Sequence, residues 1–162
     1  VDVEVDKRLD ANGSDEALAL RGKAAVAQAK LAFKLFTETF SGPRWEALAT
    51  RGARVQRPLW ASTSTKNPEY PDTLYVDELI GPDTVNTLPD ATLEAFADHG
   101  TVARRIDADV DQAEAVWAAL PGVGVDMDDV ADQLEREGVA SFMGAFDELI
   151  EALEAKAAEL RS

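Results

Sequence analysis

A cluster of small polar side chains follows a short apolar run near the middle of the chain. Residues 59–61 (Leu-Trp-Ala) lead into four consecutive hydroxyl residues at 62–65 and then into a lysine. Hydroxyls, loop backbone N–H groups and an ammonium group can together bind a phosphate. The alternative is a Ser/Thr-rich turn with an exposed lysine. On the first interpretation, the residues predicted to contact phosphate are Ser62, Thr63, Ser64 and Lys66.

The elements that must position this loop are two predicted strands. The apolar run favours a strand that is covered on both faces, and Pro58 fits near its start, where no ladder donor is lost. Residues 84–88 form a second run of β-formers between turn signals. Helical patterns at 74–80 and 90–98 alternate with these strands, which predicts a parallel pair joined by a crossover. Ligand contacts in α/β folds lie at the carboxyl ends of such strands.

The rest of the chain has a helical pattern. Residues 15–40 carry an apolar stripe that includes three phenylalanines, expected in the core, and the lysines at 23, 30 and 34 are predicted to lie off it in solvent. Residues 1–9 suggest a strand end running into a short helix. Further helices are predicted at 109–120, 127–137 and 139–160, with Gly138 separating the last two. The last helix has an acidic outer face, typical of a packing helix rather than a membrane one.

Composition limits the classes of partner. The 162 residues suffice for about one domain, and the net charge of −15 argues against nucleic-acid and anionic-membrane partners. No apolar stretch approaches the ~18 residues of a membrane span. The absence of cysteine excludes disulfides and thiolate chemistry and favours a cytoplasmic setting. The chain opens without a methionine, as a segment cut from a longer protein would.

The other candidate groups for catalysis or metal binding are the single histidine and the clustered acids. Because His99 is the only histidine, no histidine metal cluster or Ser-His-Asp triad can form. Asp107, Asp109 and Asp111 have the opening spacing of a calcium loop, but the required glycine and glutamate are absent, so they are predicted to cap a helix. We therefore predict no metal and no cofactor. Adjacent acids such as Asp77 and Glu78 point apart and are predicted to be solvated.

Lysines were considered separately, because a desolvated lysine can form a Schiff base. All except Lys66 fall on charged helix faces that are predicted to be exposed, and Lys66 lies on an open loop. The sequence therefore predicts no Schiff-base lysine in this chain.

Residues 57–68, 72–76 and 84–89, together with Leu79 and the opening residues 1–9, closely resemble transaldolase of the actinobacterial and cyanobacterial type. The resemblance covers essentially the whole chain and is strongest at 57–89. It implies a (β/α)8 barrel that moves a three-carbon dihydroxyacetone unit between sugar phosphates through a lysine Schiff base.

The resemblance also implies how the chain maps onto that barrel. Residues 1–162 would be the C-terminal segment of a single barrel domain, with strand seven at 59–62, strand eight at 84–88 and the tail helices outside. Ser62 falls where the family has a serine that contacts phosphate. Many members carry an arginine or lysine just after that serine, whereas here Lys66 is the nearest cation. The Schiff-base lysine, the acid/base carboxylates and an arginine expected before Val1 would lie outside this sequence.

The implied function is a cytoplasmic transferase of the pentose phosphate pathway. It would transfer dihydroxyacetone from sedoheptulose 7-phosphate to glyceraldehyde 3-phosphate, and this segment alone would be inactive without the N-terminal remainder of the barrel. Two alternatives stay open at this point. One is a related class I barrel aldolase, and the other is a non-catalytic helical interaction domain.

Overall fold

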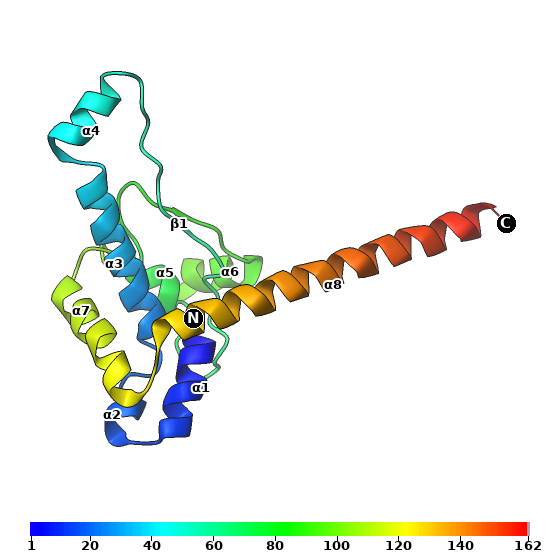
Figure 1. Cartoon of the computed structure of the whole chain (residues 1–162), viewed down its shortest axis with the longest axis horizontal. Helices are drawn as coiled ribbons and strands as arrows, with labels where there is room; N and C mark the ends of the chain where they lie inside the picture. Colours follow the sequence, from blue (N-terminus) through cyan, green and yellow to red (C-terminus); the bar gives the residue numbers. More distant parts are fainter. Residues whose placement is uncertain (162) are drawn as a thin grey trace. The chain divides into compact units, whose positions relative to one another are not determined.

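The computed structural model describes residues 1–161, which divide into a unit at 1–125 and a second unit that begins at Asp126. The second unit consists mainly of one long helix, α8 (Met127–Arg161) (Figure 1). The elements of the first unit are, in chain order, α1 (Asp2–Asn12), α2 (Asp15–Leu18), α3 (Ala24–Thr39), α4 (Gly42–Ala49), β1 (Leu59–Trp60), α5 (Leu74–Glu78), β2 (Val85–Asn86), α6 (Asp90–His99), α7 (Val110–Ala119) and the 3-10 turn η1 (Leu120–Val123).

The two strands pair in parallel, as predicted, with Leu59 opposite Val85 and Trp60 opposite Asn86. Helix α5 lies in the crossover that joins them. Both strands are shorter than predicted, and β1 ends where the backbone of Ser62 turns into the left-handed region. Within residues 1–161 β1 is covered on one face only, contrary to the expectation that both faces are covered. Trp60 packs on the helical layer, whereas Leu59, on the opposite face of the strand, is 53% exposed.

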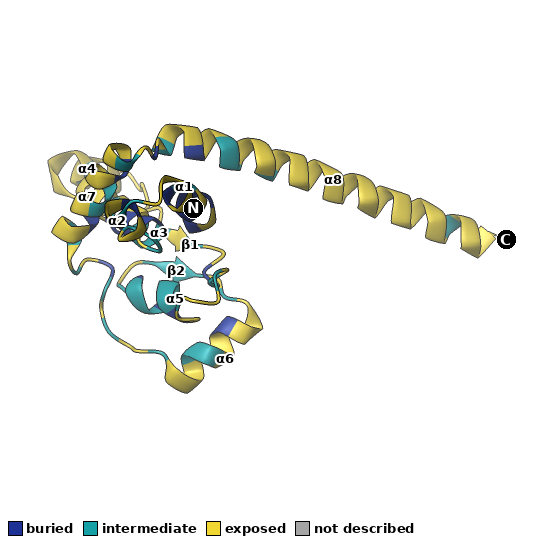
Figure 2. Cartoon of the chain, turned by 90° about the horizontal axis from the view of Figure 1, so that it is seen from below, coloured by how far each residue is buried: buried dark blue, intermediate teal, exposed yellow. Residues whose placement is uncertain are grey.

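The core beside the sheet is built from Phe33 of α3, Leu79 and Ile106, and Trp60 packs against it. Figure 2 shows buried residues in dark blue on α1 and α3. The prediction that the phenylalanine stripe enters the core is confirmed for Phe33, which is buried. The other two rings, Phe36 and Phe40, are half-buried, because they continue the stripe toward the end of α3 that α4 follows.

The amino-terminal residues differ from their predicted structure. The chain is helical from Asp2, with no strand end before α1. The acids that alternate with valines in sequence therefore lie at helical spacing, and Asp2 and Asp6 are both buried. In helix α6, Leu93 is 52% exposed and Thr92 is the residue that is buried.

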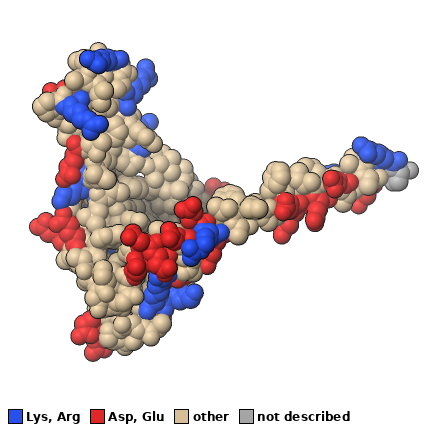
Figure 3. Space-filling view, in the orientation of Figure 1, with Lys and Arg blue, Asp and Glu red and all other residues tan. Residues whose placement is uncertain are grey.

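Helix α8 runs without interruption through Gly138, so the prediction that this glycine separates two helices is wrong. A glycine inside a helix costs about 1 kcal/mol relative to alanine, which a helix of this length tolerates. Acidic side chains lie along it (Figure 3), and an apolar stripe is exposed. The stripe consists of Val139, Phe142, Phe146, Leu149 and Leu153. Among residues 1–161, no helix combines the length and the apolar character needed to cross a membrane.

Candidate phosphate-binding site

The loop that follows β1 lines a hollow of about 580 Å³ in the first unit. The opposite walls come from the start of α1, from the α3 face that carries Ala25 and Ala29, and from Tyr75 of α5. The fold therefore brings the polar loop to the carboxyl end of β1 and opens it onto a hollow. The predicted site residues that line this hollow are Ser62, Thr63, Ser64 and Lys66.

Ser62 is the residue at which the strand becomes the loop. Its backbone φ of 57° lies in the left-handed region, which costs a non-glycine residue about 1–2 kcal/mol. Its side chain is exposed at the hollow. Backbone strain of this kind concentrates at functional sites, where the surrounding structure holds it in place.

Thr63 lies behind this surface and is only 4% exposed. Its hydroxyl donates to Asn86 Oδ1 at 2.9 Å, and the carbonyl oxygen of Thr87 is 3.4 Å away. The hydroxyl thus joins the loop after β1 to the carboxyl end of β2, and it is already engaged within the protein.

Lys66 and Ser64 form the polar rim of the hollow. Lys66 Nζ donates to Ser64 Oγ at 2.8 Å, and the lysine is exposed. An ammonium group has three donors, so two remain for a ligand. A cation beside two serine hydroxyls is a good receptor for an anion that approaches from the hollow.

Asp2 contributes a carboxylate on the opposite wall, which sequence reasoning did not assign to the site. Its Oδ2 accepts a hydrogen bond from the Tyr75 hydroxyl at 2.6 Å, and its Oδ1 accepts one from the Ala25 backbone N–H at 2.7 Å. Burial raises the pKa of Asp2 above its ordinary value, against the effect of these two bonds. The signal that could have found it is helical spacing, since Asp2 and Asp6 are four residues apart and share one face of α1.

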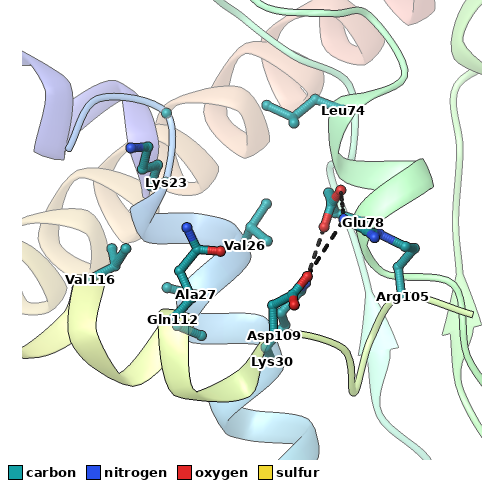
Figure 4. Close-up of a pocket in the computed structure, with 12 residues that line it drawn as sticks. Lys23, Val26, Ala27, Lys30, Leu74, Glu78, Arg105, Asp109, Gln112 and Val116 are labelled. Atoms are coloured by element: carbon teal, nitrogen blue, oxygen red, sulfur yellow. Dashed lines mark hydrogen bonds and ion pairs between the residues drawn. The ribbon is translucent and has the colours of Figure 1, made fainter. Parts of the chain in front are cut away.

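A second, separate pocket of about 250 Å³ holds a buried lysine (Figure 4). Lys30 Nζ donates to Glu78 Oε2 at 3.0 Å and to the Ala108 carbonyl oxygen at 3.1 Å. Arg105 binds the other oxygen of Glu78 at 3.0 Å. The expectations that Lys30 and Glu78 are solvated are therefore wrong. Lys30 follows Val26 by four residues and precedes Phe33 by three, so it belongs to the apolar stripe of α3.

The Lys30 cluster does not resemble a covalent catalytic site. Burial tends to raise the pKa of Glu78, but the hydrogen bonds and charges of Lys30 and Arg105 outweigh it, and the pKa lies below its ordinary value. Schiff-base chemistry needs an amine that faces an open site. Lys30 Nζ is instead held between two acceptors, so this geometry favours a structural role.

The other polar residues considered in the sequence, Asp107, Asp109 and His99, do not line the hollow. Asp107 pairs with Arg104, and Asp109 starts α7 without a capping hydrogen bond from its side chain, so the capping prediction is wrong for Asp109. His99, exposed at the end of α6, lies between Asp72 at 2.9 Å and Asp98 at 3.1 Å. The hydrogen bonds that His99 donates to the carboxylates of Asp72 and Asp98 raise the pKa of His99.

The parallel strands and the polar loop at their carboxyl ends define the kind of site that barrel enzymes use. Residues 1–153 match the family model described as Transaldolase/Fructose-6-phosphate aldolase. The chain therefore belongs to the transaldolase/fructose-6-phosphate aldolase family, which confirms the resemblance. The family implies a TIM barrel, and a mostly helical structure with a small parallel sheet is consistent with part of one.

Three relatives show how close the similarity is. The chain is 56% identical over 151 residues to the transaldolase of Frankia alni, a match that covers 93% of this chain and 41% of the relative. It is 55% identical over 152 residues to the transaldolase of Thermobifida fusca, a match that covers 93% of this chain and 41% of that relative. It is 52% identical over 153 residues to the transaldolase of Mycolicibacterium smegmatis, covering 94% and 41%. The chain thus spans about two fifths of the length of these relatives.

Proposed function

We propose that this chain is part of a transaldolase and that the loop after β1 binds the phosphate group of its sugar substrates. The observation that carries this proposal is that Ser62, Ser64 and Lys66 line one hollow at the carboxyl end of β1, which pairs in parallel with β2. In barrel enzymes the loops after the last two strands are the frequent phosphate site.

The proposed reaction moves a dihydroxyacetone unit from sedoheptulose 7-phosphate to glyceraldehyde 3-phosphate in the pentose phosphate pathway, within the cytoplasm. The lysine that carries the unit as a Schiff base, and the acid/base carboxylates, would be supplied outside this segment. The role of this segment is to bind the phosphate end of donor and acceptor. Lys66 supplies the positive charge, and the hydroxyls of Ser62 and Ser64 supply neutral donors.

Residues 1–162 are proposed to be the C-terminal segment of one barrel domain, with β1 as strand seven and β2 as strand eight. Within residues 1–161, β1 pairs with β2 alone, so its other edge has no strand partner. The exposed Leu59 and the hollow beside β1 offer a surface on which further barrel structure can pack. The N-terminal remainder of the barrel is therefore the partner that we propose.

The family name favours one alternative, an aldolase that releases the three-carbon unit instead of transferring it. The two activities differ in whether product formation requires an acceptor aldehyde phosphate. Measuring product with and without glyceraldehyde 3-phosphate distinguishes them.

The test uses a chimera in which the whole chain replaces the matching part of the Frankia alni transaldolase. Ser62→Ala and Lys66→Ala are expected to raise KM for sedoheptulose 7-phosphate by roughly tenfold or more, because each removes a hydrogen bond to a charged group. Lys23→Ala, at an exposed lysine outside the hollow, is the control and should leave KM unchanged. An unchanged KM in both site variants would remove the phosphate assignment.

The chain by itself supplies a second test. Treatment of the isolated chain with sugar phosphate and borohydride should trap no imine, because the reactive lysine is proposed to lie elsewhere. A trapped adduct on Lys30 or on any other lysine would contradict the proposal.

A further inference from the structure

Two buried carboxylates lie one turn apart on α1. Asp2 is 4% exposed and Asp6 is 7% exposed, and residues four apart share one face of a helix. A carboxylate is expensive to bury unless its oxygens accept hydrogen bonds. The hydrogen-bond donors to the four carboxylate oxygens of Asp2 and Asp6 therefore show which segments these two residues hold together.

Each carboxylate accepts two hydrogen bonds, one from a backbone N–H and one from a tyrosine hydroxyl. One oxygen of each carboxylate accepts a hydrogen bond from a backbone N–H at or just before the start of α3. Ala25 N–H donates to Asp2 at 2.7 Å, and Gly22 N–H donates to Asp6 at 3.0 Å. Ala25 lies in the first turn of α3, where a helix leaves N–H groups without intrahelical acceptors and where its dipole favours negative charge, and Gly22 lies just before the N-cap residue Lys23. The other oxygen accepts a tyrosine hydroxyl.

The two tyrosines belong to the segment that follows the predicted phosphate loop. Tyr75 binds Asp2 at 2.6 Å, and Tyr70 binds Asp6 at 2.7 Å. The backbone N–H of Tyr70 in turn donates to the Asn67 carbonyl oxygen at 3.2 Å. Asn67 directly follows Lys66, so the Asp6–Tyr70 bond anchors the carboxyl end of the loop.

The ring of Tyr70 is also fixed by packing. A Cβ placed on Gly22 would lie 2.8 Å from Tyr70 Cζ, so the ring sits directly against the glycine backbone. Gly22 has a φ of 69°, which favours glycine independently of the ring. Burial, with the hydrogen bond to Asp6, raises the pKa of Tyr70 to about 12, so its hydroxyl remains a donor at neutral pH.

The same groups border the hollow that the loop lines. Asp2, Tyr75 and Lys66 line both this hollow and a neighbouring one of about 300 Å³, to which Asp6 and Tyr70 also contribute. The four-residue network therefore lies alongside the polar loop and joins the segment after it to two helices.

We propose that Asp2 and Asp6 are positioning residues that, through Tyr75 and Tyr70, hold the loop carrying Ser62 and Lys66 in its phosphate-binding geometry. They act on the loop and not on the substrate. The proposal rests on the phosphate-binding function proposed above, and it adds that the affinity for phosphate depends on a network outside the loop.

The test removes only the two hydroxyls, with Tyr70→Phe and Tyr75→Phe in the same chimera, because phenylalanine keeps the ring packing. Deuterium exchange is followed in peptides covering residues 62–70 and, as an internal reference, residues 22–27. The loop peptide is expected to exchange roughly tenfold faster, because each variant loses a hydrogen bond to a charged acceptor. The reference peptide should keep its rate, since the carboxylates still accept its N–H groups. Equal loop rates in parent and both variants would overturn the proposal.

Kinetics supply the second readout. KM for sedoheptulose 7-phosphate is expected to rise roughly fivefold to tenfold in the tyrosine variants with kcat within about twofold, a split that general loss of structure would not produce. Asp15→Asn, at an exposed acid of α2, is the matched control. Suppose that the tyrosine variants exchange faster in residues 62–70 but keep the parent KM, while Ser62→Ala raises KM. That result would refute the positioning role and leave the phosphate site intact. If neither Ser62→Ala nor Lys66→Ala changes KM, the phosphate site itself is refuted.

Discussion

The ammonium of Lys30 lies 3.0 Å from the carboxylate of Glu78, and the lysine side chain is only 5% exposed. This pair joins α3 to α5 across the interior of the first unit. Lys30 is removed from water and Glu78 is only partly exposed, so the buried ammonium depends on this carboxylate for compensation.

Lys30→Met is expected to destabilise the fold by about 3 kcal/mol, because it leaves Glu78 partly buried with Arg105 as its remaining partner. Urea unfolding of parent and variant measures the loss. The double variant Lys30→Met/Glu78→Leu should recover part of it, since two apolar side chains leave no uncompensated charge. Lys34→Met, at a half-exposed lysine on the same helix, is the control, and an equal loss there would contradict this account.

Two glycine-to-alanine substitutions should change stability in opposite directions. A Cβ on Gly81 would overlap Ile106 Cγ2 in the core, so Gly81→Ala should cost about 1–3 kcal/mol. A Cβ on Gly138 meets nothing within 4 Å and lies inside α8, so Gly138→Ala should stabilise that helix by about 0.5–1 kcal/mol. Thermal unfolding followed by circular dichroism measures both. A loss at Gly138 would indicate that α8 bends or contacts another surface there.

The His99 cluster predicts a dependence of stability on pH. Its carboxylate partners raise the folded pKa of His99 above the unfolded value of about 6.5, so the stabilisation is complete below that value and is lost as pH rises through the folded pKa. The hydrogen bond from His99 lowers the pKa of Asp72, so that carboxylate contributes above about pH 4 and loses its contribution in acid. Urea midpoints should therefore be higher at about pH 5.5 than at about pH 8. His99→Gln should reduce this difference, and an unchanged difference would show that other groups cause it.

Ser62 offers a substitution that separates backbone strain from ligand binding. Ser62→Gly should raise the melting temperature slightly, by the equivalent of at most about 1 kcal/mol, because glycine adopts the left-handed conformation without strain. It should also raise KM for phosphorylated substrates in the chimera, because the hydroxyl is lost. Ser62→Ala should raise KM equally but should not gain stability. Equal melting temperatures for the glycine and alanine variants would show that the φ of Ser62 stores no strain.

The parallel strand pair and most helices could be predicted because their signals are local. Residues 59–61 and 84–88 are short runs of β-formers between turn residues, and the helices show apolar residues at helical spacing. Gly138 does not end α8, because a lone glycine ends a helix only when other stop signals accompany it. The burial of Lys30 does not follow from its charge, which favours solvent, but from its position on the buried stripe of α3.

The polar loop could also be predicted, but its supports could not. The four predicted residues all lie within residues 62–66, and all of them line the hollow. The bonds from Asp2 to Tyr75 and from Asp6 to Tyr70 join residues 73 and 64 positions apart. No periodicity links such distant groups, and only the packing of α1 against α3 and the segment at 70–75 brings them together. Thr63 shows the same limit, since its partner Asn86 is 23 residues away.

The long separation within these aspartate–tyrosine pairs has a consequence for synthesis. The acids of α1 leave the ribosome more than sixty residues before their tyrosines do. At typical rates of about 5–20 residues per second, helix α1 waits several seconds before its hydroxyl partners emerge. During that interval Asp2 and Asp6 can accept only the backbone N–H groups of Ala25 and Gly22, so the order of translation delays the tyrosine hydrogen bonds until the middle of the chain has been made.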